Sequence, residues 1–138
     1  GCDWTDVHVK QGFARRPSTV SFSTILGFGT GSVKVYLGPY RERESYERVI
    51  AVPFFSPSGR VVVEGPEEYP APLDQRLILQ PGHYKLFAAQ QVVDEDKELI
   101  DLYFHRLDEP AENSEILVAD DELDPPEILL EEAEIAEV

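Results

Sequence analysis

The chain has 138 residues, 42% of them hydrophobic, and this length and composition are typical of one globular domain with its own core. The formal net charge of −15 argues against direct binding to nucleic acid or to anionic membranes, because both depend on Lys and Arg. It favours a basic protein as partner. No segment approaches the roughly 20 apolar residues of a membrane span.

The first predicted element is a single helical stretch or turn in residues 3–12, with Asp or Thr as its cap, and Pro17 ends any helix there. Trp4 and His8 lie among acidic residues, which allows an acid–base cluster. We prefer a structural interpretation, in which the acids cap the helix and Trp4 packs on the body. The residues of this structural motif are Asp3, Trp4, Asp6, Gly12 and Phe13.

Alternation of apolar and polar residues then predicts eight strands. They lie at residues 20–23, 33–37, 48–55, 60–64, 75–79, 83–90, 99–107 and 114–118. Pro53 bends the third strand or places it at a sheet edge. Strands at such short intervals, with Gly and Pro in the turns, predict an all-β protein, a single-domain β-sandwich over residues 1–118.

Residues 119–138 are predicted to form an acidic C-terminal extension. From Asp108 onward the chain has thirteen acids and no Lys or Arg, whereas the first 107 residues hold 14 acids and 12 bases. Apolar residues at helical spacing favour a final amphipathic helix over residues 127–138.

Three interpretations of this extension stay open. Acidic segments are usually solvated or disordered. Alternatively, the carboxylates attract a basic groove on a partner protein, or the interleaved Ile128, Leu129, Leu130 and Ile135 dock the segment on its own sandwich. The candidate partner-binding residues are Asp120, Asp121, Glu122, Asp124, Glu127, Glu131 and Glu132, followed by Tyr40 and Tyr69 in exposed loops.

No catalytic, cofactor or metal site is predicted, so we expect a protein that is not an enzyme. The glycines of residues 27–31 precede a strand and not a helix, which favours a hairpin connection over a phosphate loop. Residues 94–96 are acidic but lack the remaining ligands of a calcium loop. Cys2 is the only cysteine, so no internal disulfide forms, which fits a reducing compartment and a cytoplasmic location.

Three blocks of sequence resemble the competence protein J family. They are Asp3-Trp4-Thr5-Asp6 with Gly12-Phe13-Ala14 and Val20-Ser21-Phe22, then Ser45-Tyr46-Glu47-Arg48 running into Val52-Pro53-Phe54, and Leu79-Gln80-Pro81-Gly82-His83-Tyr84-Lys85-Leu86. The resemblance implies a protein inhibitor bound to a bacterial DNA-cleaving nuclease. The alternatives are an immunity protein against another basic toxin, or a ligand-binding or hydrolase-like β domain.

Overall fold

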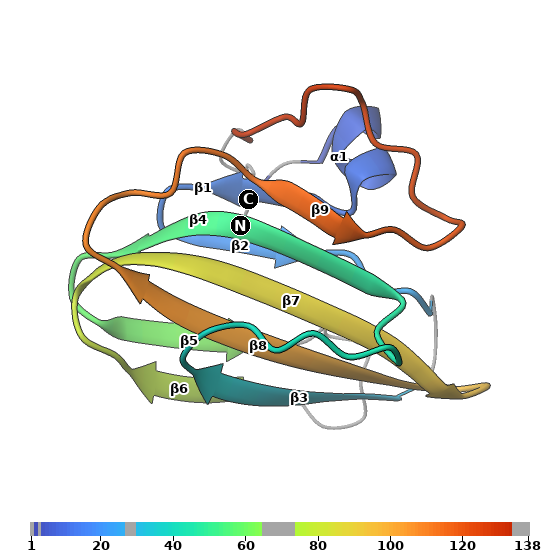
Figure 1. Ribbon diagram of the computed structural model, residues 1–138, viewed down its shortest axis with the longest axis horizontal. Helices are drawn as coiled ribbons and strands as arrows, with labels where there is room; N and C mark the ends of the chain where they lie inside the picture. Colours follow the sequence, from blue (N-terminus) through green and yellow to red (C-terminus); the bar gives the residue numbers. More distant parts are fainter. Residues whose placement is uncertain (1, 3, 27–29, 65–73, 134–138) are drawn as a thin grey trace.

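A computed structural model describes residues 2, 4–26, 30–64 and 74–133, and in these residues the chain is mostly β, with one short helix (Figure 1). The elements are α1 (Asp6–Gln11), β1 (Phe13–Arg16), β2 (Thr19–Phe22), β3 (Thr30–Leu37), β4 (Arg48–Ser56), β5 (Arg60–Glu64), β6 (Asp74–Ile78), β7 (Gly82–Asp94), β8 (Lys97–Leu107) and β9 (Glu115–Val118). The all-β prediction is confirmed, and each of the eight predicted strands corresponds to one of these strands.

The main sheet has five strands in the order β3-β8-β7-β4-β9. β3 runs parallel to β8, and the other neighbouring pairs are antiparallel. Two antiparallel hairpins, β1–β2 and β5–β6, lie behind this sheet in Figure 1. The sheet and the hairpins form two layers with the main core between them, as expected for a sandwich.

The core follows from the period of two along each strand, which sends alternate side chains to one face. Ile50, Val52 and Phe54 of β4 point into the same cluster as Leu86 of β7 and Phe104 of β8, and all are at most 9% exposed. The hairpins close this cluster with Phe13, Val20, Phe22, Val61, Val63 and Leu77.

Gly12 sets the turn between α1 and β1. Its φ is 84°, in the left-handed region, and its N–H donates to the carbonyl of His8 (2.9 Å) to end the helix. A Cβ at this position would lie 2.9 Å from Cδ2 of Leu123 and 3.1 Å from Cδ1 of Ile50. Both the backbone conformation and the close packing therefore require glycine here.

Pro53 lies in the part of β4 that pairs with β7 but not with β9. The pairing of β4 with β9 covers only Val49–Ala51. Beyond it, the carbonyl of Pro53 accepts a hydrogen bond from Nε of Arg15 (3.2 Å), and the N–H of Phe55 donates to the carbonyl of Pro17 (2.7 Å). The predicted edge position of Pro53 agrees with this geometry.

Two sequence-based predictions need correction. The strand β1 was not predicted, because Phe13-Ala14-Arg15-Arg16 is short and shows no alternation. The predicted C-terminal helix is wrong for residues 127–133, which have a bend at 127–128 and otherwise no regular secondary structure. Their backbone groups bond to α1 and β1 in place of a helical ladder, as described below. Residues 134–138 of that predicted helix lie outside the described residues, as do residues 27–29 of the predicted glycine turn.

Candidate functional site

Residues 119–133, here called the strap, run along α1 and β1 at the top of Figure 1. Near its start, Asp120 binds Arg48 of β4, and at its end the N–H of Ala133 donates to the carbonyl of Arg15 in β1 (2.8 Å). The strap is thus attached to the body at both ends. Most of the predicted partner-binding residues lie in it.

The first anchor of the strap is a buried ion pair. Nε and Nη2 of Arg48 donate to the two carboxylate oxygens of Asp120 at 2.6 and 2.9 Å. The side chains are 2% and 13% exposed. Burial raises the pKa of the Asp120 carboxyl, but the hydrogen bonds and charge of Arg48 outweigh burial and hold that pKa below its usual value. Asp120 is therefore a structural carboxylate.

Side chains of α1 and β1 bind the strap through its backbone. Gln11, fully buried, donates from Nε2 to the carbonyl of Leu130 and accepts from the N–H of Leu130, both at 2.9 Å. Arg16 donates to the carbonyl of Ala133 (2.9 Å), and the N–H of Asp124 donates to the carbonyl of Lys10 (2.9 Å). These contacts fix the path of the strap without using its side chains.

His8 adds a further backbone contact. Its Nδ1 accepts from the backbone N–H of Thr5 (2.9 Å), the N-cap residue of α1. Its Nε2 therefore carries the proton and donates to the carbonyl of Glu132 (3.3 Å). These bonds use both ring nitrogens of the buried His8, which explains its position on the inner side of the helix.

Glu131 is the second carboxylate that serves the fold. It accepts hydrogen bonds from the backbone N–H and the hydroxyl of Ser114, at 2.8 and 2.7 Å. It also lies 3.5 Å from Nη1 of Arg15. Burial lowers the pKa of the Arg15 guanidinium, and the charge of Glu131 opposes that shift. The strap therefore uses Asp120 and Glu131 internally.

The other predicted carboxylates of the strap face solvent. Exposed side chains among them are Asp121, Glu122, Asp124, Glu127 and Glu132. Glu122 is 66% exposed and lies 3.8 Å from Arg48. The apolar residues of the strap likewise include some that pack on the body and one that faces solvent. Leu123 and Leu129 pack against the core, whereas Ile128 is 85% exposed. The structure thus separates residues that attach the strap from residues that are available to a partner.

The N-terminal motif lies beside the end of the strap. Trp4 packs against a small buried cluster of Cys2, Ala14 and Ala133, and its ring meets the ring of His8 edge-on at 6.2 Å. Asp6 is exposed in the first turn of α1. Asp3 lies outside the described residues.

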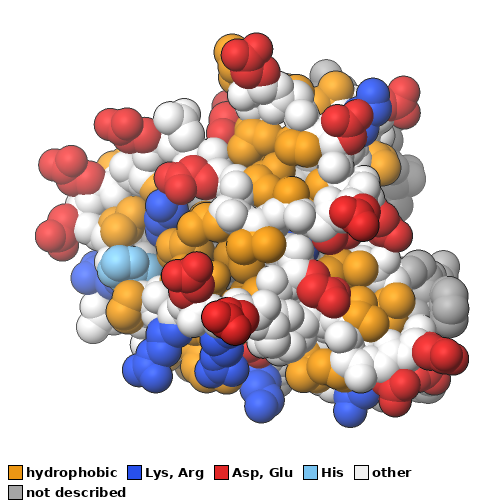
Figure 2. All heavy atoms as spheres, turned by 45° about the vertical axis from the view of Figure 1, so that its right-hand side comes forward, with side chains coloured by type: hydrophobic (Ala, Val, Ile, Leu, Met, Phe, Trp, Pro, Cys, Tyr) orange, Lys and Arg blue, Asp and Glu red, His pale blue; other side chains and the backbone are white. Residues whose placement is uncertain are grey.

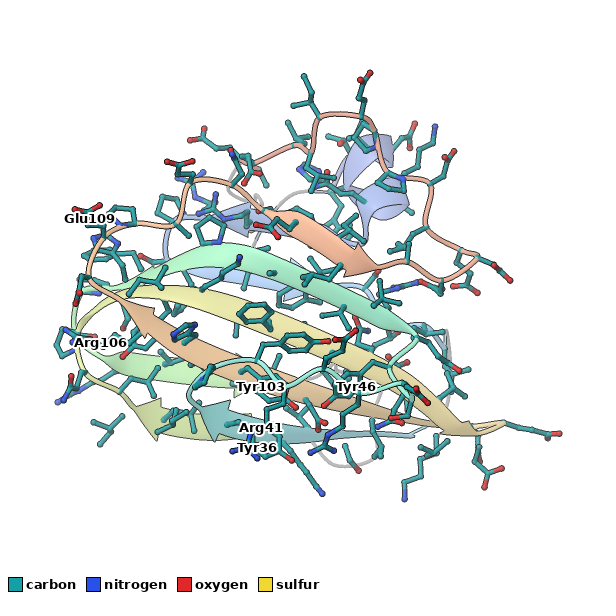
Figure 3. The ribbon with its side chains drawn as sticks, viewed as in Figure 1. Tyr36, Arg41, Tyr46, Tyr103, Arg106 and Glu109 are labelled. Carbon is teal, nitrogen blue, oxygen red and sulfur yellow. The ribbon has the colours of Figure 1, made fainter. Side chains whose placement is uncertain are left out.

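A second candidate surface covers the opposite face of the main sheet. It consists of stacked rings, here called the tyrosine cluster: Tyr36, Tyr40, Tyr46, Phe87 and Tyr103. Tyr40 stacks on Phe87 at 4.8 Å, and Tyr36 stacks on Tyr103 at 4.9 Å. Figure 3 shows Tyr36, Tyr46 and Tyr103 grouped together beside Arg41, whereas Arg106 and Glu109 lie at the far end of β8. Aromatic rings next to arginines are typical of protein interfaces.

A chain of hydrogen bonds holds the tyrosine cluster together. The hydroxyl of Tyr46 donates to Asp101 (2.6 Å), so it accepts from the hydroxyl of Tyr103 (2.6 Å). Burial raises the pKa of Tyr46, and its hydrogen bonds to Asp101 and Tyr103 add to that shift. Burial also raises the pKa of Tyr40, which is only half-buried.

The sequence pointed to Tyr40 and Tyr69 but not to the rest of this cluster. Tyr69 lies outside the described residues. One feature of the sequence could have pointed to Tyr46 and Tyr103. The carboxylate of Asp101 lies in the middle of an apolar strand, and a buried carboxylate needs hydrogen-bond donors nearby.

Glu98 is a further buried carboxylate, at 1% exposed. It accepts from the backbone N–H groups of Ile25 (3.1 Å) and Leu26 (3.0 Å) and from Nε2 of Gln90 (2.9 Å). Through these hydrogen bonds, Glu98 holds the segment after β2 in place. Within the described part of the chain, no group of three His, Cys, Asp or Glu side chains is placed to hold a metal ion, and no helix is long and apolar enough to cross a membrane.

Charge is unevenly distributed over the surface. Figure 2 shows Lys and Arg side chains gathered along the lower side, while Asp and Glu side chains spread over the upper part and the flanks. Exposed cations of the body include Lys34, Arg41, Arg43, Arg60 and Arg106. In α1 and the strap, Lys10 is the one Lys or Arg residue. The strap itself holds seven Asp and Glu residues and no Lys or Arg.

Comparison with known proteins gave one finding. The model of the family Competence protein J (ComJ) matches residues 1–109. Comparisons with curated proteins and with solved structures found no match. The matched range extends from the N-terminal motif through β8, so β9 and the strap lie beyond it.

Proposed function

The chain belongs to the competence protein J family, and from this premise we propose that it binds and inhibits a bacterial DNA-cleaving nuclease. Family membership points to a competence-related role. The nuclease, and inhibition by direct binding, are our proposal. Inhibition of this kind needs no catalytic group in the inhibitor, because occupying the cleft is enough to exclude DNA.

The observation that supports this proposal most is the exposed charge of the strap. Asp121, Glu122, Asp124, Glu127 and Glu132 face solvent along one ordered segment. A DNA-cleaving nuclease must attract phosphates, so its cleft carries positive potential. Complementary potentials increase the rate of encounter and favour the correct orientation. An acidic segment that is already ordered also loses little conformational entropy on binding.

The proposal is tested by removing exposed charge without disturbing the fold. The variant replaces three exposed acids of the strap, Asp124→Asn, Glu127→Gln and Glu132→Gln. The control replaces three exposed acids elsewhere, Glu42→Gln, Glu44→Gln and Glu95→Gln. Both proteins then carry the same net charge. Deletion of the strap is a poorer test, because it would uncover the buried Arg48 and Gln11.

Association with the DNA-cleaving nuclease of the same bacterium is measured by stopped flow at several salt concentrations. We expect the strap variant to associate about tenfold more slowly at low salt, and to lose most of the salt dependence, since exposed charges are screened beyond about 8 Å at physiological salt. The control should remain close to the unmodified protein. A nuclease that cleaves DNA equally well with and without excess unmodified protein would overturn the proposal.

A further inference from the structure

The strap presents the apolar side chain of Ile128 to solvent. Ile128 is 85% exposed, although its neighbour Leu129 packs against the core. Leu130, two residues further along, is 37% exposed, as is Val7 of α1. Because Gln11 binds the backbone of Leu130, and Val7 lies one helical turn before Gln11, the three apolar side chains belong to adjoining segments.

The position of Ile128 is fixed from both sides. On one side, the N–H of Asp124 is bonded to the carbonyl of Lys10. On the other side, Leu129 is packed in the core and Leu130 is held by two hydrogen bonds to the fully buried Gln11. The backbone around Ile128 is therefore ordered before any partner binds, and little freedom is lost when a partner covers the side chain.

Exposed acids lie on the same two segments as this apolar group. Asp6, Asp124, Glu127 and Glu132 all face solvent on α1 and the strap. An apolar centre with a charged rim is the usual layout of a protein interface. The negative rim excludes an acidic partner and fits a surface of Lys and Arg around an apolar pocket.

We propose that Ile128 is the apolar anchor of the inhibitory interface and enters a pocket in the basic face of the nuclease. This inference rests on the proposed function. In it, the acidic rim sets the rate of association, whereas burial of Ile128, together with Leu130 and Val7, slows dissociation.

The experiment compares Ile128→Ala with a matched control, Ile78→Ala. Ile78 is 86% exposed, on β6, so the two substitutions remove the same atoms from equally exposed positions. Both variants should melt at the temperature of the unmodified protein. We expect Ile128→Ala to raise the dissociation rate from the nuclease, and hence Kd, by about tenfold or more, with the association rate unchanged. Ile78→Ala should change neither rate.

The possible outcomes separate the two proposals. If the unmodified protein does not bind the nuclease, the proposed function fails. If it binds and the two alanine variants dissociate equally fast, the proposed function stands and the anchor at Ile128 is refuted. A loss of affinity on Tyr40→Ala with none on Ile128→Ala would likewise refute it, and would move the interface to the tyrosine cluster.

Discussion

The strap and the segment of residues 38–47 are two irregular segments that lie on the same body but are held in different ways. The strap is attached mainly through its backbone, by Gln11, His8 and Arg16. The segment 38–47 has one backbone hydrogen bond to the sheet at each end, and between them it is attached through the rings of Tyr40 and Tyr46, which stack and hydrogen-bond on the sheet.

This difference decides which side chains are free to serve function. Because the strap is attached through its backbone, many of its side chains stay exposed. The fold does not use them, so they are available for contacts with the proposed partner. Side-chain attachment commits the aromatic rings of residues 38–47 to the fold, whereas Pro39, residues 41–45 and Glu47 remain exposed. We therefore place the proposed recognition of a partner on the strap and not on the tyrosine cluster.

The largest expected effect is at the ion pair that anchors the strap. Arg48→Ala leaves the carboxylate of Asp120 without its buried counter-charge and removes the donor to Ser23. We expect a loss of about 3–5 kcal/mol in the free energy of unfolding. Urea denaturation followed by the fluorescence of Trp4 measures this change. A loss below about 1 kcal/mol would mean that the strap is not anchored there.

A smaller effect is expected in the tyrosine cluster. Tyr46→Phe keeps the ring but leaves Asp101 and Tyr103 without their shared hydroxyl partner. The expected cost is about 1–3 kcal/mol in the free energy of unfolding. Tyr36→Phe is the control, since Tyr36 contacts Tyr103 by ring stacking, and it should cost less than about 0.5 kcal/mol. Equal effects of the two variants would show that stacking alone holds the cluster.

The smallest effect is the pH dependence at Asp120. Its folded-state pKa lies below the usual value, so the stability it provides is present above the unfolded-state pKa of about 4. This stability is lost as the pH falls through the lower, folded-state pKa. Asp120→Asn should therefore flatten the decrease in melting temperature below about pH 4, relative to the unmodified protein. Glu127→Gln, at an exposed carboxylate of the same strap, should leave that decrease unchanged.

Most of the strands could be predicted from the sequence because their signal is local. Alternation in segments such as His83–Gln90 arises wherever one face of a strand is buried, and it needs no knowledge of the partner strand. Gly12 and Pro53 likewise show their conformational restrictions in the sequence itself. The excess of acids from Asp108 onward was also visible, and it is the basis for expecting a basic partner.

The role of each acidic residue was decided only by the tertiary structure. Residues 127–133 have helical spacing, yet Gln11, 119 positions before Leu130, provides the hydrogen bonds that a helix would otherwise supply. In the same way, Arg48 and Ser114 convert Asp120 and Glu131 into structural groups while their neighbours stay exposed. A carboxylate looks the same in the sequence whether it is paired or free, because its partner comes from a distant part of the chain that only folding brings within reach.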